Sequence, residues 1–272
     1  RDETTTTAEA EAKTYKEPKQ KQEDENMASA ASSSVTPLID IGANLAAGTF
    51  RRDLPAILER ALSAPRPVKP IIITGSSVKS ARDAVRLCQK YPEHGLYTTV
   101  GIHPHWATDY KGESTYAQLR ELAKLPEVVA VGETGLDFNR NKSPPEQQEL
   151  SFRKHLELAQ ELELPMFLHE RDAASAFLDI IKDFPLGASN KIPAVVHCFT
   201  GSEETLRRYV ELDLHIGITG FVCNKSRGKD LRAALAKRVV PLDRLMIETD
   251  CPYMSPPKCP RRNEPMYLSH VL

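Results

Sequence analysis

Residues of the types that bind divalent cations follow four separate apolar stretches of the sequence, each near the point where the stretch ends. They are Glu133, His169, His197 and Asp250. Two imidazoles and two carboxylates form a donor set that suits a divalent metal. Such a metal lowers the pKa of a bound water and stabilises charge on a scissile phosphate or carbonyl. The residue types therefore predict hydrolytic chemistry, provided that the fold brings the four side chains together.

Glu133 is the most informative of the four, because it stands between two glycines in the segment Val131-Gly-Glu-Thr-Gly. Glycines let the backbone turn sharply or approach another group closely, which core packing alone seldom requires. A capped strand whose glutamate meets solvent is the structural alternative. Each of the four residues taken singly is more often structural, but four at matching positions favour a site.

Two further imidazoles, His103 and His105, follow another apolar stretch in the segment Gly101-Ile-His-Pro-His. They are candidates for the same site. The other histidines are expected to be structural, since they fall on presumed helices or on turns at the opposite end of the strands: His94, His155, His215 and His270.

The elements that must position these residues alternate between short apolar runs and segments with helical spacing. Alternating strands and helices predict an α/β fold with parallel strands, here a closed TIM-like (β/α)8 barrel. In such a barrel the residues at the C-terminal strand ends converge on one face. An open doubly wound sheet would need a glycine-rich loop after the first strand, and Gly42-Ala-Asn is not one. The candidate strands are 38–42, 70–74, 96–101, 128–132, 165–168, 192–196, 214–219 and 244–248.

Helix signals support the alternation. Ser143-Pro-Pro-Glu predicts a capping box that opens a helix with Phe152, Leu156 and Ala159 on one face. Ser202 is expected to open another helix. A last helix begins near Pro265 and is expected to be truncated, which would leave apolar barrel surface exposed.

The length and composition of the chain fit one domain. The chain has 272 residues, 40% of them hydrophobic, which suits a single barrel over residues 37–272. Residues 1–36 are polar, carry a net charge of −3 and predict a disordered tail, which leaves +2 for the remainder. Any site for a polyanion must therefore be a local patch.

Composition also bears on location. The five cysteines lack a CxxC pair, which indicates reduced thiols of an intracellular protein, cytoplasmic or nuclear. No apolar run approaches the roughly 20 residues that span a bilayer, so no membrane association is expected.

Several motifs follow one another along the chain: Asp40-Ile-Gly-Ala-Asn-Leu, Gly101-Ile-His-Pro-His, Val131-Gly-Glu-Thr-Gly-Leu-Asp-Phe-Asn-Arg, Leu168-His-Glu-Arg-Asp, Val196-His-Cys-Phe-Thr-Gly, Gly217-Ile-Thr-Gly, Ile247-Glu-Thr-Asp-Cys-Pro-Tyr and Arg261-Arg-Asn-Glu-Pro. In combination and order, these motifs resemble the TatD family of metal-dependent deoxyribonucleases. The resemblance covers the chain from about Leu38 to its end. It implies a TIM barrel of the amidohydrolase type and 3′-to-5′ exonuclease action on DNA, single-stranded or at 3′ ends, sometimes linked to DNA repair.

The resemblance also implies roles for single residues. Glu133, His169, His197 and Asp250 match the family's metal ligands, and Asp250 would also accept the proton of the attacking water. Glu133 and Asp250 are therefore the expected catalytic residues.

His103 and His105 match a pair near the substrate phosphate, to whose oxygens imidazoles can donate. Asp137 and Glu248 resemble residues that orient the ligands. Arg171 could hold an acidic neighbour or meet phosphate.

A local basic rim is a further expectation, although a solvated loop is the alternative for each of its members. The candidates are Arg140, Lys258, Arg261 and Arg262.

One departure concerns the metal. Many relatives carry His-x-His after the first strand, where this chain has Gly42 and Asn44, as in the TatD branch proper. Asn44 could offer a weaker oxygen ligand or contact the substrate. Oxygen-rich ligation suits Mg²⁺, whereas the two histidine ligands also accept Mn²⁺ or Zn²⁺.

Two other functions stay open from the residues. The same site could hydrolyse an ester or amide, as in a deacylase of D-aminoacyl-tRNA. A non-catalytic binding barrel is the second alternative.

Overall fold

The protein is described here by a computed structural model that covers residues 35–187, 192–257, 259 and 262–272. Thr36–Leu272 form one compact unit. The polar tail predicted at residues 1–36 lies outside the described residues except for Val35 and Thr36.

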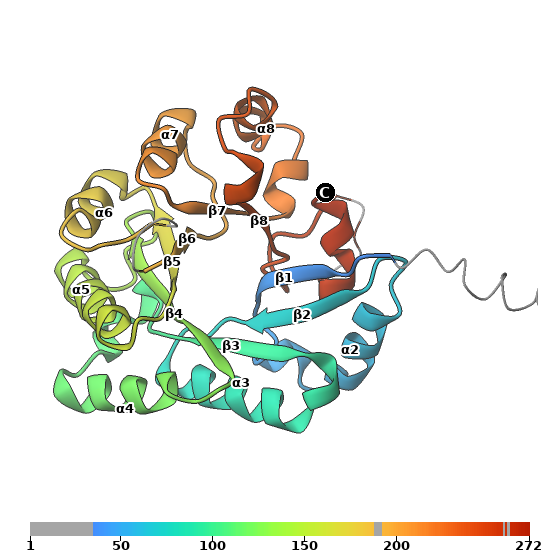
Figure 1. The fold of residues 1–272 in the computed structure, drawn as a ribbon, viewed down its shortest axis with the longest axis horizontal. Coiled ribbons are helices and arrows are strands. Elements are labelled where there is room, and N and C mark those ends of the chain that lie inside the picture. The colour runs from blue at the N-terminus through green and yellow to red at the C-terminus, as the bar shows by residue number, and fades with distance from the viewer. Residues whose placement is uncertain (1–34, 188–191, 258, 260–261) are drawn as a thin grey trace, which may run out of the picture. The chain divides into compact units, whose positions relative to one another are not determined.

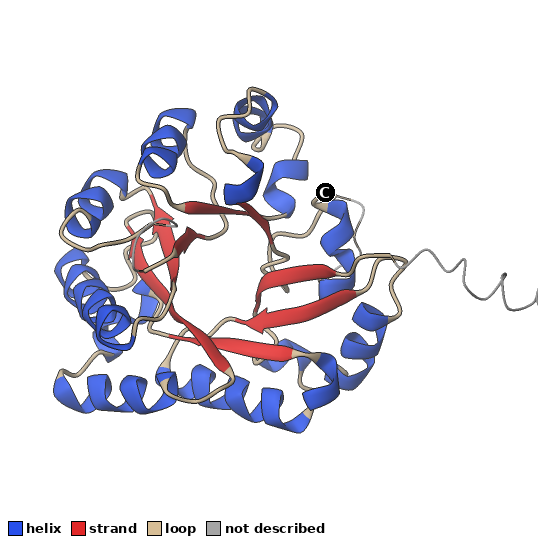
Figure 2. Ribbon diagram, in the orientation of Figure 1, coloured by secondary structure: helices blue, strands red, loops and turns tan. Residues whose placement is uncertain are grey.

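Eight parallel strands follow one another in chain order around a single sheet, and helices surround them (Figures 1 and 2). The ring closes where Ala43 bridges to Cys251 and the amide of Asn44 donates to the carbonyl of Cys251 over 2.8 Å. The predicted TIM-like (β/α)8 barrel is thereby confirmed. The strands are β1 (Leu38–Ala43), β2 (Val68–Ile73), β3 (Leu96–Val100), β4 (Val128–Asp137), β5 (Met166–Arg171), β6 (Ala194–Val196), β7 (His215–Ile218) and β8 (Leu245–Ile247).

The α-helices fall between the strands, as parallel connections require. They are α2 (Leu54–Leu62), α3 (Val78–Lys90), α4 (Glu113–Ala123), α5 (Pro145–Leu162), α6 (Ala174–Ile181), α7 (Glu203–Glu211) and α8 (Lys229–Ala236). Within the described ranges, none of these helices combines the length and the apolarity needed to cross a membrane.

Two helix starts were predicted, with different outcomes. Ser202 caps α7, and its side chain accepts from the amide of Thr205. The capping box at Ser143 was wrong, because α5 has Pro144 at its N-cap. The Ser143 hydroxyl instead donates to the carbonyl of His105. This hydrogen bond holds the Ser143 side chain against the loop after β3.

The segment after Pro265 forms a 3₁₀ helix, η6 (Pro265–His270), rather than the α-helix that its spacing predicted. Glu264 anchors its start, since its carboxylate lies 2.7 Å from Arg60 and 2.8 Å from Arg262. Leu268 is fully buried against the core.

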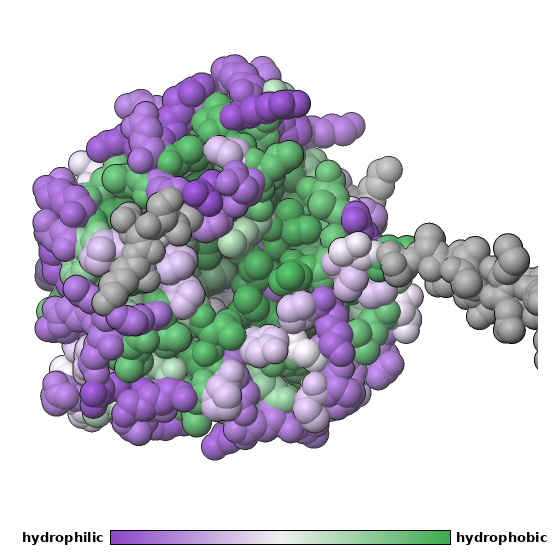
Figure 3. All heavy atoms as spheres, in the orientation of Figure 1, coloured by the Kyte–Doolittle hydropathy of each residue, from purple (hydrophilic) through white to green (hydrophobic). Residues whose placement is uncertain are grey.

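The core lies between the barrel and its helices. Figure 3 shows apolar side chains gathered in the middle of one face of the ring, with hydrophilic ones around its rim. The predicted apolar face of α5 is confirmed, because Phe152, Leu156 and Ala159 are fully buried. Phe177 of α6 stacks on Phe152 at 5.2 Å between ring centroids and meets Tyr209 of α7 edge-on at 5.6 Å.

Replacing Phe177 with alanine is expected to lower the free energy of unfolding by about 3–5 kcal/mol, because it opens a cavity among three aromatic rings. Urea denaturation followed by circular dichroism measures the change. Leu150→Ala on the solvent side of α5, where the side chain is 43% exposed, is the control and should cost no more than about 0.5 kcal/mol. Equal losses for the two variants would contradict this account of the core.

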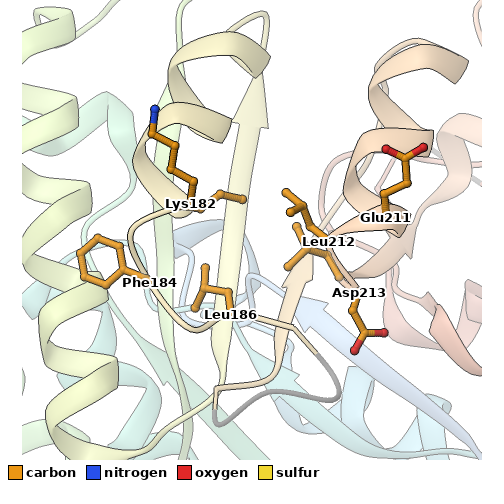
Figure 4. Close-up of a pocket in the computed structure, with 8 residues that line it drawn as sticks. Lys182, Phe184, Leu186, Glu211, Leu212 and Asp213 are labelled. Atoms are coloured by element: carbon orange, nitrogen blue, oxygen red, sulfur yellow. The ribbon is translucent and has the colours of Figure 1, made fainter.

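A hollow of about 290 Å³ lies between the C-terminal ends of α6 and α7. Figure 4 shows side chains from both segments around it, among them Lys182, Glu211 and Asp213. These segments lead into β6 and β7, so the hollow lies at the N-terminal ends of the strands. It is therefore distinct from the site that the strand-end residues form.

Candidate metal centre

Strand β4 carries Glu133 within its length, not after its end, because the strand continues to Asp137 and pairs with β5 as far as Arg171. The two glycines make this pairing possible. A Cβ at Gly132 would lie 2.1 Å from the carbonyl oxygen of Phe167, and one at Gly135 would lie 2.0 Å from that of His169. Both glycines also have positive φ, of 146° and 141°. The close approach expected from the sequence is therefore made to β5.

Three imidazoles surround one carboxylate oxygen of Glu133. Its Oε1 lies 2.9 Å from Nε2 of His197, 3.0 Å from Nδ1 of His169 and 3.2 Å from Nε2 of His103. The three histidines come from β5, from the end of β6 and from the loop after β3. Residues far apart in the sequence thus meet at one face of the barrel.

These groups have the donor chemistry of a metal site. One ligand atom each from His103, Glu133 and His169 lies within 4.8 Å of the other two. Imidazole nitrogens and a carboxylate oxygen are the ligands that Zn²⁺ and Mn²⁺ accept, and Mg²⁺ accepts the carboxylate. The residues therefore fit a divalent cation.

The charges in this cluster depend on one another. Burial alone would raise the pKa of Glu133, but the imidazoles of His103 and His197 lower it well below its usual range. Burial likewise disfavours charge on His197, but Glu248 and Glu133 raise its pKa well above the usual value. The pKa of His103 is lowered, chiefly by burial. The lowered pKa favours the anionic form of Glu133 among these imidazoles.

Asp137 forms a second acceptor beside Glu133. Its Oδ2 lies 2.9 Å from Nε2 of His105 and 3.3 Å from Nε2 of His169. Its Oδ1 accepts from the amide of Arg140 over 2.9 Å. His169 is therefore held at both ring nitrogens, by Glu133 and by Asp137, which fixes the plane of its ring.

Glu248 plays the corresponding part for His197. Its Oε2 lies 3.3 Å from Nδ1 of His197, and its Oε1 accepts from the amide of Cys198 over 2.5 Å. Glu248 is fully buried. Gly42 leaves the room for it, because a Cβ at Gly42 would lie 2.2 Å from Glu248 Oε2.

Asp250 lies near this cluster, on the segment after β8. Its Oδ1 accepts from the side-chain amide of Asn44 over 2.9 Å. Burial, the largest influence, raises the pKa of Asp250 to about 7, while nearby His197 opposes that rise. Asp250 thus lies within electrostatic reach of His197 and Glu133.

Among the described residues, no hydrogen bond or ion pair joins the remaining basic candidates to Glu133. Arg140 contributes its backbone amide, and its side chain is exposed on the loop after β4. Arg171 ends β5 in register with Asp137 and is half-buried. Arg262 pairs with Asp53 and Glu264 beside α2, and its guanidinium lies 4.9 Å over the ring of Phe50. Lys258 and Arg261 lie outside the described residues.

The contact of His103 with Glu133 was not predicted, because the family resemblance assigned His103 to the substrate phosphate. The sequence feature that could have indicated this contact is Pro104, which starts the 3₁₀ helix η3 (Pro104–Asp109) and leaves His103 at its N-cap. There Nδ1 of His103 accepts from the amide of His105 over 2.9 Å, which leaves Nε2 toward Glu133.

Asp137→Asn is expected to lower hydrolytic activity about 10- to 100-fold, because an amide has one acceptor oxygen, whereas Asp137 accepts on one oxygen from two imidazoles and on the other from the amide of Arg140. Initial rates on a single-stranded oligonucleotide with a divalent metal measure the effect. Asp172→Asn, on the neighbouring loop, is the matched control and should retain activity. Unchanged rates in Asp137→Asn would show that His105 and His169 keep their places without this carboxylate.

Comparison with known proteins identifies the family of the chain. Residues 39–272 match the family model described as TatD related DNase. Curated relatives named 3′-5′ ssDNA/RNA exonuclease TatD include one from Rahnella sp. (strain Y9602), which is 44% identical over 86% of this chain and 88% of its own. A further relative of that name, from Citrobacter rodentium, is 42% identical over 86% of this chain and 88% of its own.

A solved structure gives the same result. The hydrolase TatD family protein of Entamoeba histolytica is 29% identical with a TM-score of 0.78, covering 88% of this chain and 90% of its own. The resemblance read from the motifs is therefore confirmed, and the chain belongs to the TatD related DNase family.

Proposed function

We propose that this protein is a divalent-metal-dependent exonuclease that shortens single-stranded DNA, or RNA, from the 3′ end. The observation that carries the proposal is the convergence of three imidazoles on Glu133, with Asp250 close by. The relatives of more than 40% identity are named for this activity. Membership of the family adds the hydrolytic reaction class.

Glu133, His169, His197 and Asp250 would hold the metal, and His103 is a further candidate because its Nε2 reaches the same oxygen of Glu133. We assign Mg²⁺ as the most suitable ion, with Mn²⁺ and Zn²⁺ as alternatives that the imidazoles accept. A bound cation supplies Lewis-acid stabilisation of charge on the scissile phosphate.

The protein's own residues supply the proton transfer and the orientation. Asn44 engages Oδ1 of Asp250, and the second oxygen accepts a proton from the attacking water as the water oxygen bonds to phosphorus. The bond from phosphorus to the 3′ oxygen of the preceding nucleotide breaks, and that oxygen takes up a proton. Glu133 is the second catalytic residue, since it would hold the metal with the oxygen that the three imidazoles surround.

Substrate contacts are assigned to residues around this cluster. His103 and His105 lie with ring centroids 4.3 Å apart and stay the residues predicted to lie beside the substrate phosphate. The exposed side chain of Arg140 and the half-buried Arg171 at the end of β5 are the cations nearest to Asp137 along the chain and the sheet. We assign both to the phosphate backbone, with Asn44 at the inner end of the substrate site.

The test is degradation of a single-stranded oligonucleotide labelled at its 5′ end, with Mg²⁺ present. A ladder that shortens progressively from the 3′ end is expected, and a phosphorothioate at the last linkage should stop it. D-aminoacyl-tRNA is assayed beside it under the same conditions. Release of the amino acid with no shortening of the oligonucleotide would reject the exonuclease and favour a deacylase.

A further inference from the structure

A basic groove runs along the outside of the barrel between α3 and the loop that joins β1 to α2. It has a volume of about 630 Å³. We define it by its five cationic side chains: Arg51 and Arg52 from the loop, and Lys79, Arg86 and Lys90 from α3. All five residues are exposed. Because the chain as a whole is nearly neutral, a polyanion can bind only at a local basic patch. The groove is such a patch.

The groove keeps a strong positive excess. Asp83 is its one carboxylate among the described lining residues, and it lies 2.7 Å from Lys79 and 2.9 Å from Arg86. A hydrogen bond from Lys79 is the main reason that the pKa of Asp83 is lowered. One carboxylate against five cations leaves four positive charges in a hollow, whose low-dielectric walls strengthen their field.

The floor of the groove is apolar, in contrast to its rim. It is made by small and aliphatic side chains of the loop and of α2, together with Leu87 and Tyr91. Nζ of Lys90 lies 5.2 Å from the centroid of the Tyr91 ring. A cationic rim that tracks a backbone, with an aromatic ring against which a base can stack, is the combination that binds single-stranded nucleic acid.

Both walls of the groove begin beside the metal centre. The loop that carries Arg51 and Arg52 starts at Asn44, whose amide donates to Asp250. The other wall, α3, follows Ser76, whose carbonyl accepts from the amide of His103 over 3.0 Å. The groove therefore starts on the face of the barrel that carries the metal centre.

The groove is long enough for several nucleotides. Lys79 and Lys90 lie at opposite ends of α3, about 16 Å apart at a rise of 1.5 Å per residue. Successive phosphates of a stacked strand are about 3.4 Å apart along its axis. The cations of the groove can therefore contact more than one phosphate at once.

We propose that this groove binds the sugar–phosphate backbone of a single-stranded nucleic acid on the 5′ side of the bond that is cleaved. The proposal rests on the proposed exonuclease function for the direction of the strand. The binding surface itself rests on charge, shape and its start on the face that carries the metal centre. The groove thus contributes affinity for long strands and takes no part in the chemical step.

The test compares two triple variants of the full chain that lose the same charge. Arg51→Ala/Arg52→Ala/Lys90→Ala removes three cations of the groove. Lys124→Ala/Lys182→Ala/Lys237→Ala removes three exposed lysines that pair with acids elsewhere on the barrel. Binding of a fluorescent oligothymidine of about 12 nucleotides, within the range that such grooves occupy, is measured by anisotropy in EDTA so that no cleavage occurs.

The groove variant should bind at least 10-fold more weakly at low salt, and the slope of log affinity against log salt should become less negative by about 2. In cleavage assays its KM should rise for this oligonucleotide and stay unchanged for a dinucleotide, with kcat unchanged. The control should follow the parent protein. Both variants should unfold at the parent's temperature, since all six side chains are exposed.

Equal weakening in the two variants would overturn the proposal, because it would mean that only net charge matters. Parent-like affinity in the groove variant would overturn it as well. Polyglutamate is added as a competitor of the oligonucleotide. If it does not displace the oligonucleotide from the parent protein, the groove is specific for nucleic acid. If it does displace the oligonucleotide, the groove binds an acidic protein surface and the proposal is overturned. Binding that depends on the groove in a protein without exonuclease activity would reject the proposed function and leave the groove standing.

Discussion

Replacing Glu133 with glutamine is expected to lower exonuclease activity about 1,000-fold or more, because the change removes the anion on which the cluster is built. Its Oε1 is the shared neighbour of His103, His169 and His197. Glutamine has nearly the same shape but no charge. An amide oxygen is a weaker metal ligand than a carboxylate, and it also leaves the raised pKa of His197 without one of its two causes.

Three measurements on Glu133→Gln separate chemistry from folding. Initial rates on a single-stranded oligonucleotide report activity, calorimetric titration with Mn²⁺ reports metal affinity, and circular dichroism reports the fold. Glu121→Gln is the matched control, since this side chain is 71% exposed on α4 and pairs with Lys124. Loss of both activity and metal binding in a folded protein is expected. Activity within tenfold of the parent would remove Glu133 from the catalytic site.

Much of this arrangement could be predicted from the sequence, because a parallel barrel makes strand ends neighbours. An apolar run followed by a polar residue is a local signal, and it placed Glu133, His169 and His197 at one face. The alternation of such runs with helical segments gave the barrel. Apolar periodicity likewise identified Phe152 as part of the core.

Other features depend on contacts between distant segments, which no local pattern records. The length of β4 is set by pairing with β5 beyond Gly132, and the sequence around Glu133 reads as a turn. Ser143 matches a capping box, but its hydroxyl bonds to His105, 38 residues away. Nothing near Gly42 shows that Glu248 occupies the space that its missing side chain leaves.

The basic groove illustrates the same limit on a larger scale. Arg51 and Arg52 come from one loop and Lys79, Arg86 and Lys90 from α3, with α2 and β2 between them in the sequence. On α3 the cations recur at helical spacing, which is also the pattern of an ordinary solvated face. The candidates singled out from the sequence, Arg140 and Arg262, lie on other parts of the surface or in ion pairs.

Chelation is expected to remove essentially all exonuclease activity, because the residues near the scissile bond carry too little positive charge on their own. Within the described part of the cluster the imidazoles are offset by Glu133, Asp137 and Glu248. Activity measured in EDTA, and again after addition of excess Mg²⁺, Mn²⁺ or Zn²⁺, tests the requirement. Recovery with at least one of these ions is expected, and full activity in EDTA would contradict a metal site.

The same ion should stabilise the folded protein, which gives a readout that does not depend on activity. A ligand present at 100 times its dissociation constant adds about 2.7 kcal/mol to the free energy of unfolding, so the unfolding temperature should rise by several degrees over that in EDTA. Glu133→Gln should lose most of this rise, whereas Glu121→Gln should keep it. A rise of equal size in both variants would place the ion elsewhere on the protein. If only Glu133→Gln loses both the metal-dependent rise in unfolding temperature and the activity, the cation binds at the carboxylate that the three imidazoles share. Glu121→Gln is the control because it makes the same change of charge on the surface.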